Sequence, residues 1–595
     1  MADSEFAATQ WWQTGVIYQV YPRSFQDTNA DGIGDLPGIT ARLDYLVSLG
    51  VAALWISPFY PSPMADFGYD VADYTNVDPI FGTLADFDEL LHQAHLRGLR
   101  VILDFVPNHT SDQHPWFLES RSSRDNPKRD WYLWHDAARP ADDWVPAKHR
   151  PPNNWMSHFG GSAWTWDQKT EQLYLHSFLK EQPDLNWRNP QVRAAIYMAM
   201  CFWLDRGVDG FRMDVLWLLI KDAHYRNNPP NPQDLASTLP VFTADQPETH
   251  EIVAEMRTIL DSYGPTLPPQ LSSRPESALL ADAVERSASP AAATKPGTLD
   301  PGPWALVPAS SRVLIGEIYL PLPALVRYYG QPAENLPQLR GANLPFNFHL
   351  IQAKWHAESI AAIIRTYEAL LPAGAWPNYV LGNHDQSRLA TRIGPHQARL
   401  AAMLLLTLRG TPTLYYGDEL GMTDVPISPE QVHDPAEKNQ PGQGRGRDPE
   451  RAPMLWLDAP NAGFTTPNAT PWLPLQHDWQ TENAAAQSQR PRSMLTLYRK
   501  LLALRRAEPA LHAGPIEAIA AEGNILRFRR VDPVTGKRFQ LLFNFAANPE
   551  DHATTHCKPG RVLLTTLLDG EGARVGGEGS HLTLEAGEGL LIALD

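Results

Sequence analysis

Short apolar runs alternate with longer segments of helical periodicity along most of this chain, and this alternation restricts the fold more than any other feature. The runs are almost continuously hydrophobic and end in polar residues, which is typical of parallel strands buried on both faces. Seven of them are clear, at residues 16–22, 53–59, 101–109, 210–215, 313–320, 379–385 and 413–419. A weaker eighth run at 344–350 completes an α/β fold of the (β/α)₈ (TIM) barrel type, and an open doubly wound sheet is the alternative.

Two segments depart from a plain barrel. Residues 108–187, rich in Trp, His, Asn and Pro, are too long for an ordinary connection and predict a small loop-rich subdomain inserted after the third strand. Short strand-like segments in residues 510–595 predict a C-terminal antiparallel β domain. The barrel then comprises residues 1–107 and 188–509, with a flexible insert rich in Pro, Ala and Ser at 264–311.

The composition restricts the class of partner. Hydrophobic residues make up 43% of the 595 residues and charged residues 20%, which excludes a disordered, collagen-like or coiled-coil chain. Lys and Arg total 50 against 67 Asp and Glu, and the net charge of −17 disfavours binding to nucleic acid or to an anionic membrane. We therefore expect a small neutral or cationic ligand.

Cysteine usage and hydropathy bear on the compartment. Cys201 and Cys557 lie far apart in the sequence and give neither a disulfide framework nor a zinc pattern, as is usual in a reducing cytoplasm. The N-terminal residues show no signal peptide, and the longest apolar stretch, 401–408, is too short to cross a bilayer. These features predict a soluble cytoplasmic protein, and they leave its oligomeric state open.

Acidic residues recur at the predicted strand ends, where a barrel gathers its reactive groups. These ends carry Asp104, Asn108, His109, Arg212, Asp214, Glu317, Asn383, His384 and Asp385. A single acid there is more often a helix cap or a turn former, but a series at successive strand ends favours a functional site. Cleaving a glycosidic bond with retention needs two carboxyls ~5 Å apart, one as nucleophile and one as acid. A third acid can stabilise the positive sugar ring and raise the pKa of the acid, while Arg212 would keep Asp214 ionised.

Five ordered motifs in this chain resemble the signature blocks of the α-amylase family of glycoside hydrolases. They are DFVPNH at 104–109, QPDLN at 182–186, GFRMD at 210–214, GEIY at 316–319 and GNHD at 382–385. The QPDLN block resembles the oligo-1,6-glucosidase and α-glucosidase branch, and the likeness is closest to bacterial exo-acting α-glucosidases. It runs from about Trp11 to the C-terminus, interrupted by the 264–311 insert.

The resemblance implies a role for individual residues. Asp214 would be the nucleophile, Glu317 the general acid/base and Asp385 the transition-state stabiliser. The DFGYD segment at 66–70 looks like the clamp for the non-reducing-end glucose, and GRDPERAPM at 446–454 looks like a further segment at that sugar, although Ala452 replaces the usual Thr. The implied substrate-binding residues are Asp66, Tyr69, His109, Phe178, Gln182, Arg212, His384 and Arg451.

The segment DTNADGIGD at 27–35 predicts a structural metal site. Oxygen ligands at alternating positions suit Ca²⁺, and relatives in this branch carry Ca²⁺, sometimes Mg²⁺, in this loop. The ligands would be the side chains of Asp27, Asn29, Asp31 and Asp35 with the carbonyl of Ile33. Position twelve of the segment is Gly38 instead of a bidentate Glu, and an Asx/Gly turn after the first strand is the alternative interpretation.

The resemblance implies a retaining exo-acting α-glucosidase acting on short neutral oligosaccharides of the isomaltose, trehalose or maltose class. Val215 follows the implied nucleophile, and valine there accompanies α-1,6 or α-1,1 substrates in related enzymes; ordinary strand packing is the alternative.

A transglucosylase or isomerase of the trehalose synthase or sucrose isomerase type is the rival function. Two further rivals are weaker. An inactive transporter-associated ectodomain would have a membrane anchor, and a metal-dependent hydrolase would need zinc-ligand spacing such as HExxH.

Overall fold

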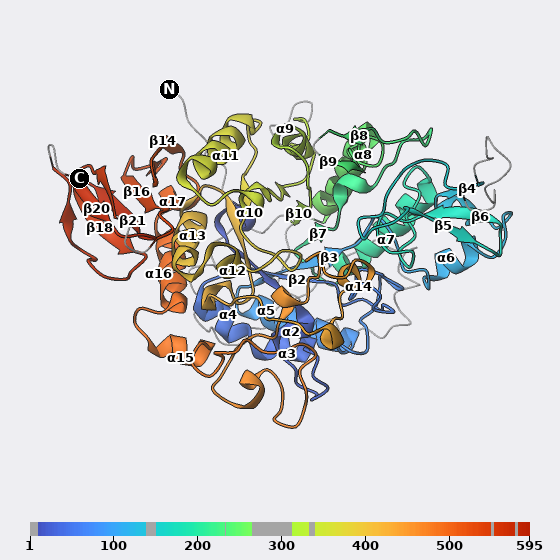
Figure 1. The fold of residues 1–595 in the computed structure, drawn as a ribbon, viewed down its shortest axis with the longest axis horizontal. Helices are drawn as coiled ribbons and strands as arrows, with labels where there is room; N and C mark the ends of the chain where they lie inside the picture. The colour runs from blue at the N-terminus through green and yellow to red at the C-terminus, as the bar shows by residue number, and fades with distance from the viewer. Residues whose placement is uncertain are drawn as a thin grey trace, which may run out of the picture.

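The computed structural model describes residues 10–137, 150–232, 234–263, 312–332, 339–548, 552–577 and 581–595. Eight parallel strands form a barrel-like sheet in the order β11-β10-β7-β3-β2-β1-β13-β12 (Figure 1). They are β1 (Ile17–Val20), β2 (Ala53–Ile56), β3 (Arg100–Phe105), β7 (Gly210–Met213), β10 (Val313–Gly316), β11 (Leu344–Pro345), β12 (Asn378–Val380) and β13 (Thr411–Tyr415). This confirms the predicted (β/α)₈ architecture, and the weak eighth run is the shortest strand.

Helices pack around the sheet because their apolar residues recur with helical spacing. In α5 (Leu84–Leu96) the buried residues Phe87, Leu90, Leu91 and Ala94 share one face, and a capping box between Thr83 and Asp86 starts the helix. The other helices of the barrel layer and its loops are α1 (Trp11–Thr14), α2 (Pro22–Phe25), α3 (Leu36–Ala41), α4 (Leu43–Leu49), α7 (Pro190–Asp205), α8 (Pro247–Ser262), α9 (Leu322–Leu325), α10 (His349–Gln352), α11 (Ala357–Leu370), α12 (Leu389–Ile393), α13 (Pro395–Thr407), α14 (Pro435–Asn439), α15 (Ala484–Gln489), α16 (Met494–Ala507) and α17 (Pro509–His512).

The predicted insertion after the third strand is a small subdomain with its own sheet. It contains α6 (Pro115–Ser120) and a three-stranded antiparallel sheet of β4 (Trp134–His135), β6 (Gln172–Leu175) and β5 (Trp164–Asp167). An isolated bridge between His109 and Asp184 ties the subdomain to the end of β3. A short hairpin, β8 (Pro230–Asn231) with β9 (Asp234–Thr238), follows β7 and was not predicted. The predicted insert at 264–311 lies outside the described residues.

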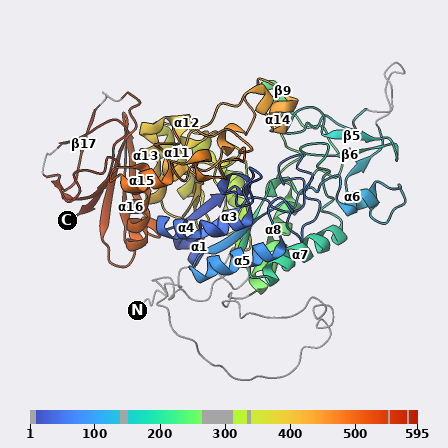
Figure 2. The same ribbon diagram turned by 90° about the horizontal axis from the view of Figure 1, so that it is seen from below.

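The C-terminal segment forms the predicted antiparallel β domain, at the opposite end of the molecule from the β4-β6-β5 subdomain (Figure 2). Its main sheet has the order β14-β15-β16-β21-β18-β19. The strands are β14 (Ile516–Glu522), β15 (Ile525–Val531), β16 (Arg538–Asn544), β18 (Gly560–Thr565), β19 (Arg574–Val575) and β21 (Gly589–Leu594), with a separate pair, β17 (Ala553–His556) and β20 (His581–Leu584).

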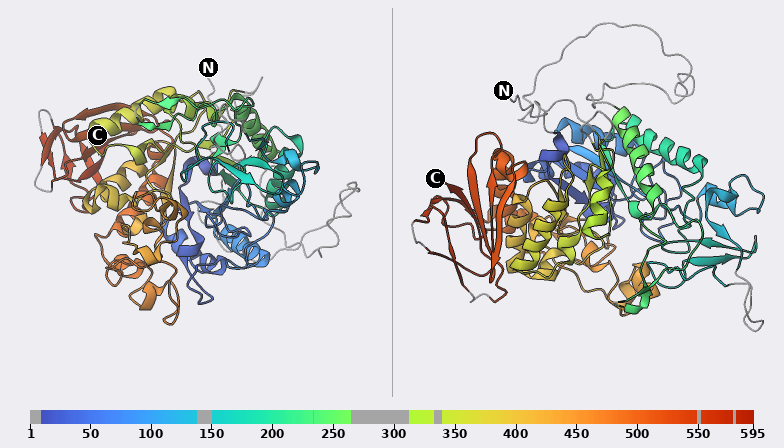
Figure 3. Two further views of the ribbon diagram at one scale, coloured as in Figure 1. Left: turned by 45° about the vertical axis from the view of Figure 1, so that its right-hand side comes forward. Right: turned by 90° about the horizontal axis from the view of Figure 1, so that it is seen from above.

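Two buried arginines join this domain to the barrel, where the terminal sheet lies against α13 and α16 (Figure 3). Arg505 of α16 donates to the carbonyls of Leu406, Leu408 and Leu511 at 2.8–2.9 Å. Arg530 of β15 donates to the carbonyls of Thr407 and Leu511. Because α13 ends at Thr407, both guanidinium groups satisfy carbonyls at its negative C-terminal end. Among the described helices, none is both long enough and apolar enough to span a membrane.

Candidate active site

A cavity of about 350 Å³ lies at the carboxyl ends of the barrel strands. Its walls include eight of the residues that the sequence predicts at the site, namely Asp66, Tyr69, His109, Phe178, Gln182, Asp214, Glu317 and Asp385. The aromatic and aliphatic part of the wall comes from His158, Phe159, Val215, Trp217, Leu218 and Tyr319, with Gln386 and Arg447 completing it. Arg212, His384 and Arg451, also predicted, are 0%, 1% and 1% exposed and lie behind this wall.

Arg212 joins three carboxylates from three neighbouring strands. β3, β7 and β10 are adjacent and in register, with Asp104 opposite Arg212, so their ends meet beside the cavity. Arg212 Nη1 lies 2.8 Å from Asp104 Oδ1 and 2.7 Å from Asp214 Oδ1, and Nη2 lies 2.7 Å from Glu317 Oε2. Asp214 and Glu317 are therefore brought together, as predicted, against one guanidinium.

Arg212 is predicted to keep Asp214 ionised, and its positive charge does lower the pKa of Asp214, but two opposing effects are larger. Burial and the negative charge of Glu317 raise the pKa of Asp214 well above its usual range, because one guanidinium is shared among three acids. Burial likewise raises the pKa of Asp104 to about 6. Asp104 and Asp214 therefore hold their protons to a higher pH than free carboxyls do. A paired acid and carboxylate is what general acid catalysis beside a nucleophile requires.

Val215 holds Glu317 through its backbone. Its φ of 38° and ψ of 44° place this β-branched residue in the left-handed region, which costs free energy for any L-residue. In that conformation its N–H donates to Glu317 Oε2 at 2.9 Å. The strained backbone thus contributes a hydrogen bond to one of the two central carboxyls.

Asp385 lies against two arginines. Its Oδ1 accepts from Arg447 Nη1 at 3.2 Å and from Arg451 Nη2 at 3.0 Å. Burial raises the pKa of Asp385, but neighbouring positive charges, including those of Arg447 and Arg451, outweigh it and hold the pKa well below its usual range. Asp385 is therefore an ionised carboxylate in the cavity wall, and its pKa is shifted in the opposite direction to that of Asp214.

Arg447 organises the inner end of the cavity and was not predicted. It donates from Nη2 to Asp66 Oδ1 at 2.6 Å and from Nε to Asp434 Oδ2 at 2.6 Å, while Gln182 Nε2 donates to Asp66 Oδ2 at 3.2 Å. The sequence motif at 446–454 contains both Arg447 and Arg451, and the resemblance assigned Arg451 to the terminal sugar. In the structure Arg447 reaches the cavity, whereas Arg451 supports Asp385 and the carbonyl of His384 from behind.

Tyr69 and His384 form a stacked pair at the base of the site. Their ring centroids lie 5.3 Å apart with planes 4° from parallel. Tyr69 Oη donates to Asp104 Oδ2 at 3.0 Å and lies 2.6 Å from His384 Nε2, and Gln19 Nε2 lies 2.7 Å from His384 Nδ1. Burial lowers the pKa of His384 well below its usual range, so the ring is neutral and Gln19 fixes its orientation.

A buried lysine supports His109. Asn108 Nδ2 lies 3.1 Å from His109 Nδ1, and His109 Nε2 lies 3.1 Å from the Tyr69 carbonyl, so Nδ1 accepts and Nε2 donates. Burial lowers the pKa of His109 to about 4. Lys221 Nζ donates to Asn108 Oδ1 at 2.7 Å and lies 2.6 Å from Asp184 Oδ2. Lys221 was not predicted, although a lysine at the end of the apolar run LWLLIK was a signal, since buried lysines need partners.

The loop at 27–35 forms a compact turn that uses its own side chains. Asp27 Oδ1 accepts from the N–H of Asn29 and Ala30, and Asp35 accepts from Thr28 and Gly38. Within the described part of the chain, no group of three or more His, Cys, Asp or Glu side chains is placed to hold a metal ion. A metal here would have to use the amide oxygen of Asn29 and the carbonyl of Ile33 as well. Bound Ca²⁺ stays a prediction.

Comparison with known proteins identifies the family. Residues 19–287 and 304–514 match the family described as "Alpha amylase, catalytic domain". A "Probable alpha-glucosidase" of Rhizobium meliloti (strain 1021) is 40% identical over 581 residues, which cover 94% of this chain and 93% of that protein. An "Oligo-1,6-glucosidase" of Parageobacillus thermoglucosidasius is 35% identical over 573 residues, 90% of each chain.

Solved structures agree with this result. The alpha-glucosyl transfer enzyme XgtA is 38% identical to this chain and superposes with a TM-score of 0.82. The match covers 99% of this chain and 100% of XgtA. The trehalulose synthase MutB from Pseudomonas mesoacidophila is 31% identical with a TM-score of 0.81, over 99% of this chain and 100% of that one. With the parallel barrel and its cluster of carboxylates, these similarities show that the chain is an enzyme of the alpha-amylase family of glycoside hydrolases, with a carbohydrate as its substrate.

Proposed function

We propose that this enzyme is a retaining exo-acting α-glucosidase that releases α-glucose from the non-reducing end of short α-glucosides. The observation that carries the proposal is that Asp214 and Glu317, at the ends of neighbouring strands, line one cavity and each lie 2.7 Å from the same guanidinium behind its wall, that of Arg212. A double displacement uses two carboxyls in one small cavity, one as the nucleophile and one as the general acid and base.

The proposed reaction proceeds in two balanced steps. First, an Asp214 oxygen attacks the anomeric carbon while Glu317 gives its proton to the glycosidic oxygen, so that the leaving alcohol departs and a glucosyl ester forms. Then Glu317 takes a proton from water, the water oxygen attacks the same carbon, and the Asp214 carboxylate leaves. Two inversions restore the α configuration. Asp385, held ionised by its arginines, would stabilise the positive charge that develops on the ring in both steps.

The polar group at the inner end of the cavity supports exo action. Asp66 accepts from both Arg447 and Gln182, so its two oxygens are held in fixed directions where a terminal sugar would present hydroxyls. A cavity of about 350 Å³ matches one or two sugar units more closely than a long chain. Tyr69, His109 and Phe178 would bind the same sugar from the other walls.

The preferred bond is proposed to be of the isomaltose or trehalose type, because Val215, a residue that accompanies such substrates in related enzymes, lines the cavity next to Asp214. Maltose hydrolysed as fast as isomaltose and trehalose would contradict this preference. The second candidate is transfer of the glucosyl group to another sugar, favoured by the likeness to XgtA and to a trehalulose synthase. A cytoplasmic location is part of the proposal and is supported by the two free cysteines.

A disaccharide panel followed by ¹H NMR tests the proposal. Isomaltose, trehalose, maltose and sucrose are incubated separately, and the first-formed glucose is scored for its anomer while other products are scored for transfer. We expect α-glucose first, a bell-shaped pH profile, and severe loss of turnover in Asp214→Asn and Glu317→Gln but not in Asp88→Asn, an exposed control on α5. First-formed β-glucose would refute retention, and isomerised or elongated sugars as the main product would favour the second candidate.

A further inference from the structure

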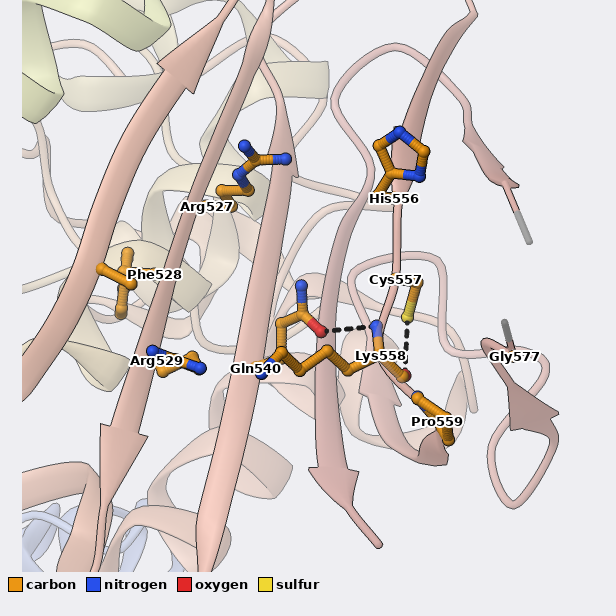
Figure 4. A pocket seen from close by; sticks show the side chains of 10 residues that line it. Arg527, Phe528, Arg529, Gln540, His556, Cys557, Lys558, Pro559 and Gly577 are labelled. Atoms are coloured by element: carbon orange, nitrogen blue, oxygen red, sulfur yellow. Dashed lines mark hydrogen bonds between the residues drawn. The ribbon is translucent and has the colours of Figure 1, made fainter. Parts of the chain in front are cut away.

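The C-terminal domain contains a second cavity of about 540 Å³, whose lining residues are all different from those of the active-site cavity. Its polar wall comes from Arg527 and Arg529 of β15, Gln540 of β16, His556 of β17 and the following Lys558 (Figure 4). On a protein with a net charge of −17, this wall gathers three permanent cations.

Strand geometry places the two arginines side by side. Residues two apart on a strand share a face, so Arg527 and Arg529 lie on the same face of β15 and both line the cavity. Phe528 between them also lines it, and its ring packs on Phe543, with ring centroids 5.6 Å apart. The register of β14 against β15 shifts between Glu517 and Ala520. Ala518 lies within this bulge of the edge strand and lines the cavity.

The cations are only weakly neutralised. Arg527 lies 3.7 Å from Glu522 and Arg529 lies 3.8 Å from Glu517, and the two glutamate side chains are 77% and 41% exposed. Such long, solvated contacts contribute little. Arg529 Nε is buried without a hydrogen-bond partner. Within the described residues the ammonium of Lys558 has no acidic partner.

Lys558 is held in position by its backbone. Gln540 Oε1 accepts from its N–H at 3.1 Å, and Cys557 Sγ donates to its carbonyl at 3.2 Å. Figure 4 shows its side chain pointing across Gln540 in the direction of Arg529. The cavity therefore offers two guanidinium groups, one ammonium and the free amide N–H₂ of Gln540 as donors on a framework of three strands.

We propose that this cavity binds the phosphate group of a small phosphorylated ligand. Guanidinium forks bind phosphate oxygens in pairs, and a phosphate monoester carries about two negative charges and three acceptor oxygens, which balance these donors better than a single carboxylate does. The volume exceeds what a phosphate ion needs and lies within the range of small-molecule sites. The remaining space takes the organic part of the ligand.

Calorimetric titration of the full-length enzyme tests this, at constant ionic strength, with inorganic phosphate, glucose 6-phosphate and glucose as probes. The double variant Arg527→Gln/Arg529→Gln is compared with Arg365→Gln, which removes an exposed arginine of α11 that pairs with Glu358. We expect both phosphate probes to bind, glucose 6-phosphate at least as tightly as inorganic phosphate, and glucose not to bind at this cavity. The double variant should weaken both at least tenfold, and Arg365→Gln should leave them unchanged.

Several results would overturn the inference. Equal phosphate binding in the double variant would place the anion elsewhere, for example at Arg447, and no binding by either probe would remove the site. Binding of inorganic phosphate alone would contradict the organic part of the assignment. Disaccharide turnover measured on the same double variant reports whether the enzyme is folded, since neither arginine contacts the active-site cavity.

Discussion

Val215 allows a quantitative test of backbone strain beside the catalytic carboxyls. The substitutions are Val215→Ala and Val215→Gly, and Val101→Ala and Val101→Gly are the matched controls. Both valines are buried, at 7% and 0% exposed, but Val101 lies within β3 and has no positive φ, whereas φ at Val215 is 38°. The comparison therefore isolates the cost of the left-handed conformation.

The expected magnitudes follow from the side-chain carbons removed. Val→Ala removes two buried carbons and costs ~1.6 kcal/mol of unfolding free energy at either position. Ala→Gly removes one more carbon and loosens the backbone, which costs roughly 1.5 kcal/mol at Val101. At Val215 the same step also relieves left-handed strain of ~1–2 kcal/mol. Val215→Gly should therefore be about as stable as Val215→Ala, within ~0.5 kcal/mol.

Differential scanning calorimetry at one scan rate, with turnover measured on the same samples, checks this. At Val101 the glycine variant should melt below the alanine variant, by roughly 1–2 °C for a protein of this size. At Val215 the two should coincide. Turnover should fall further in Val215→Gly than in Val215→Ala, because the more flexible glycine backbone holds the N–H that donates to Glu317 less firmly. A Val215→Gly variant that melts as far below Val215→Ala as the control pair does would refute the reasoning.

Three further predictions concern other groups. Arg447→Gln should lower kcat/KM for a disaccharide by at least a hundredfold, because it removes the ion-pair partner of buried Asp66. Steady-state kinetics with Arg445→Gln as the control would measure this loss. An unchanged kcat/KM would contradict the role of Arg447 in holding Asp66. Burial raises the pKa of Asp418 to about 7, so the folded state binds an extra proton below pH 7 and the charged group costs stability above it. Asp418→Asn should therefore raise Tm at pH 8 more than at pH 5, and a variant that melts lower at pH 8 would oppose this. If the loop at 27–35 binds Ca²⁺, adding Ca²⁺ after EDTA treatment should raise Tm, and Asp31→Ala should abolish this rise. An equal rise in the wild-type enzyme and in Asp31→Ala would exclude this loop as the Ca²⁺ site.

The fold was largely predictable because each barrel strand is a local pattern. A strand buried on both faces is mostly apolar, so β1, β3 and β10 stand out in the sequence. β11 gave a weak signal because only Leu344 and Pro345 pair with a neighbour. The hairpin of β8 and β9 gave none, since its residues are largely polar.

The site was predictable in its members but not in its connections. Asp214, Glu317 and Asp385 were found because strand ends converge, which follows from topology alone. Arg212 pairs with three carboxylates only because its side chain adopts one particular rotamer. No sequence pattern specifies that rotamer. Arg447 lies in a loop 62 residues after Asp385, so only the folded chain shows that it bridges Asp385 to Asp66.

The two arginines at the end of α13 make the terminal sheet inseparable from the barrel. Deleting the chain after residue 509 would remove Arg530 and the Leu511 carbonyl that Arg505 also uses, and would leave Arg505 as a buried cation with fewer acceptors. The helix so affected leads directly into β13, which pairs with β1 at the centre of the barrel. A shortened enzyme or a chimera joined at this boundary is therefore expected to have a less stable barrel, so the two parts should be engineered together.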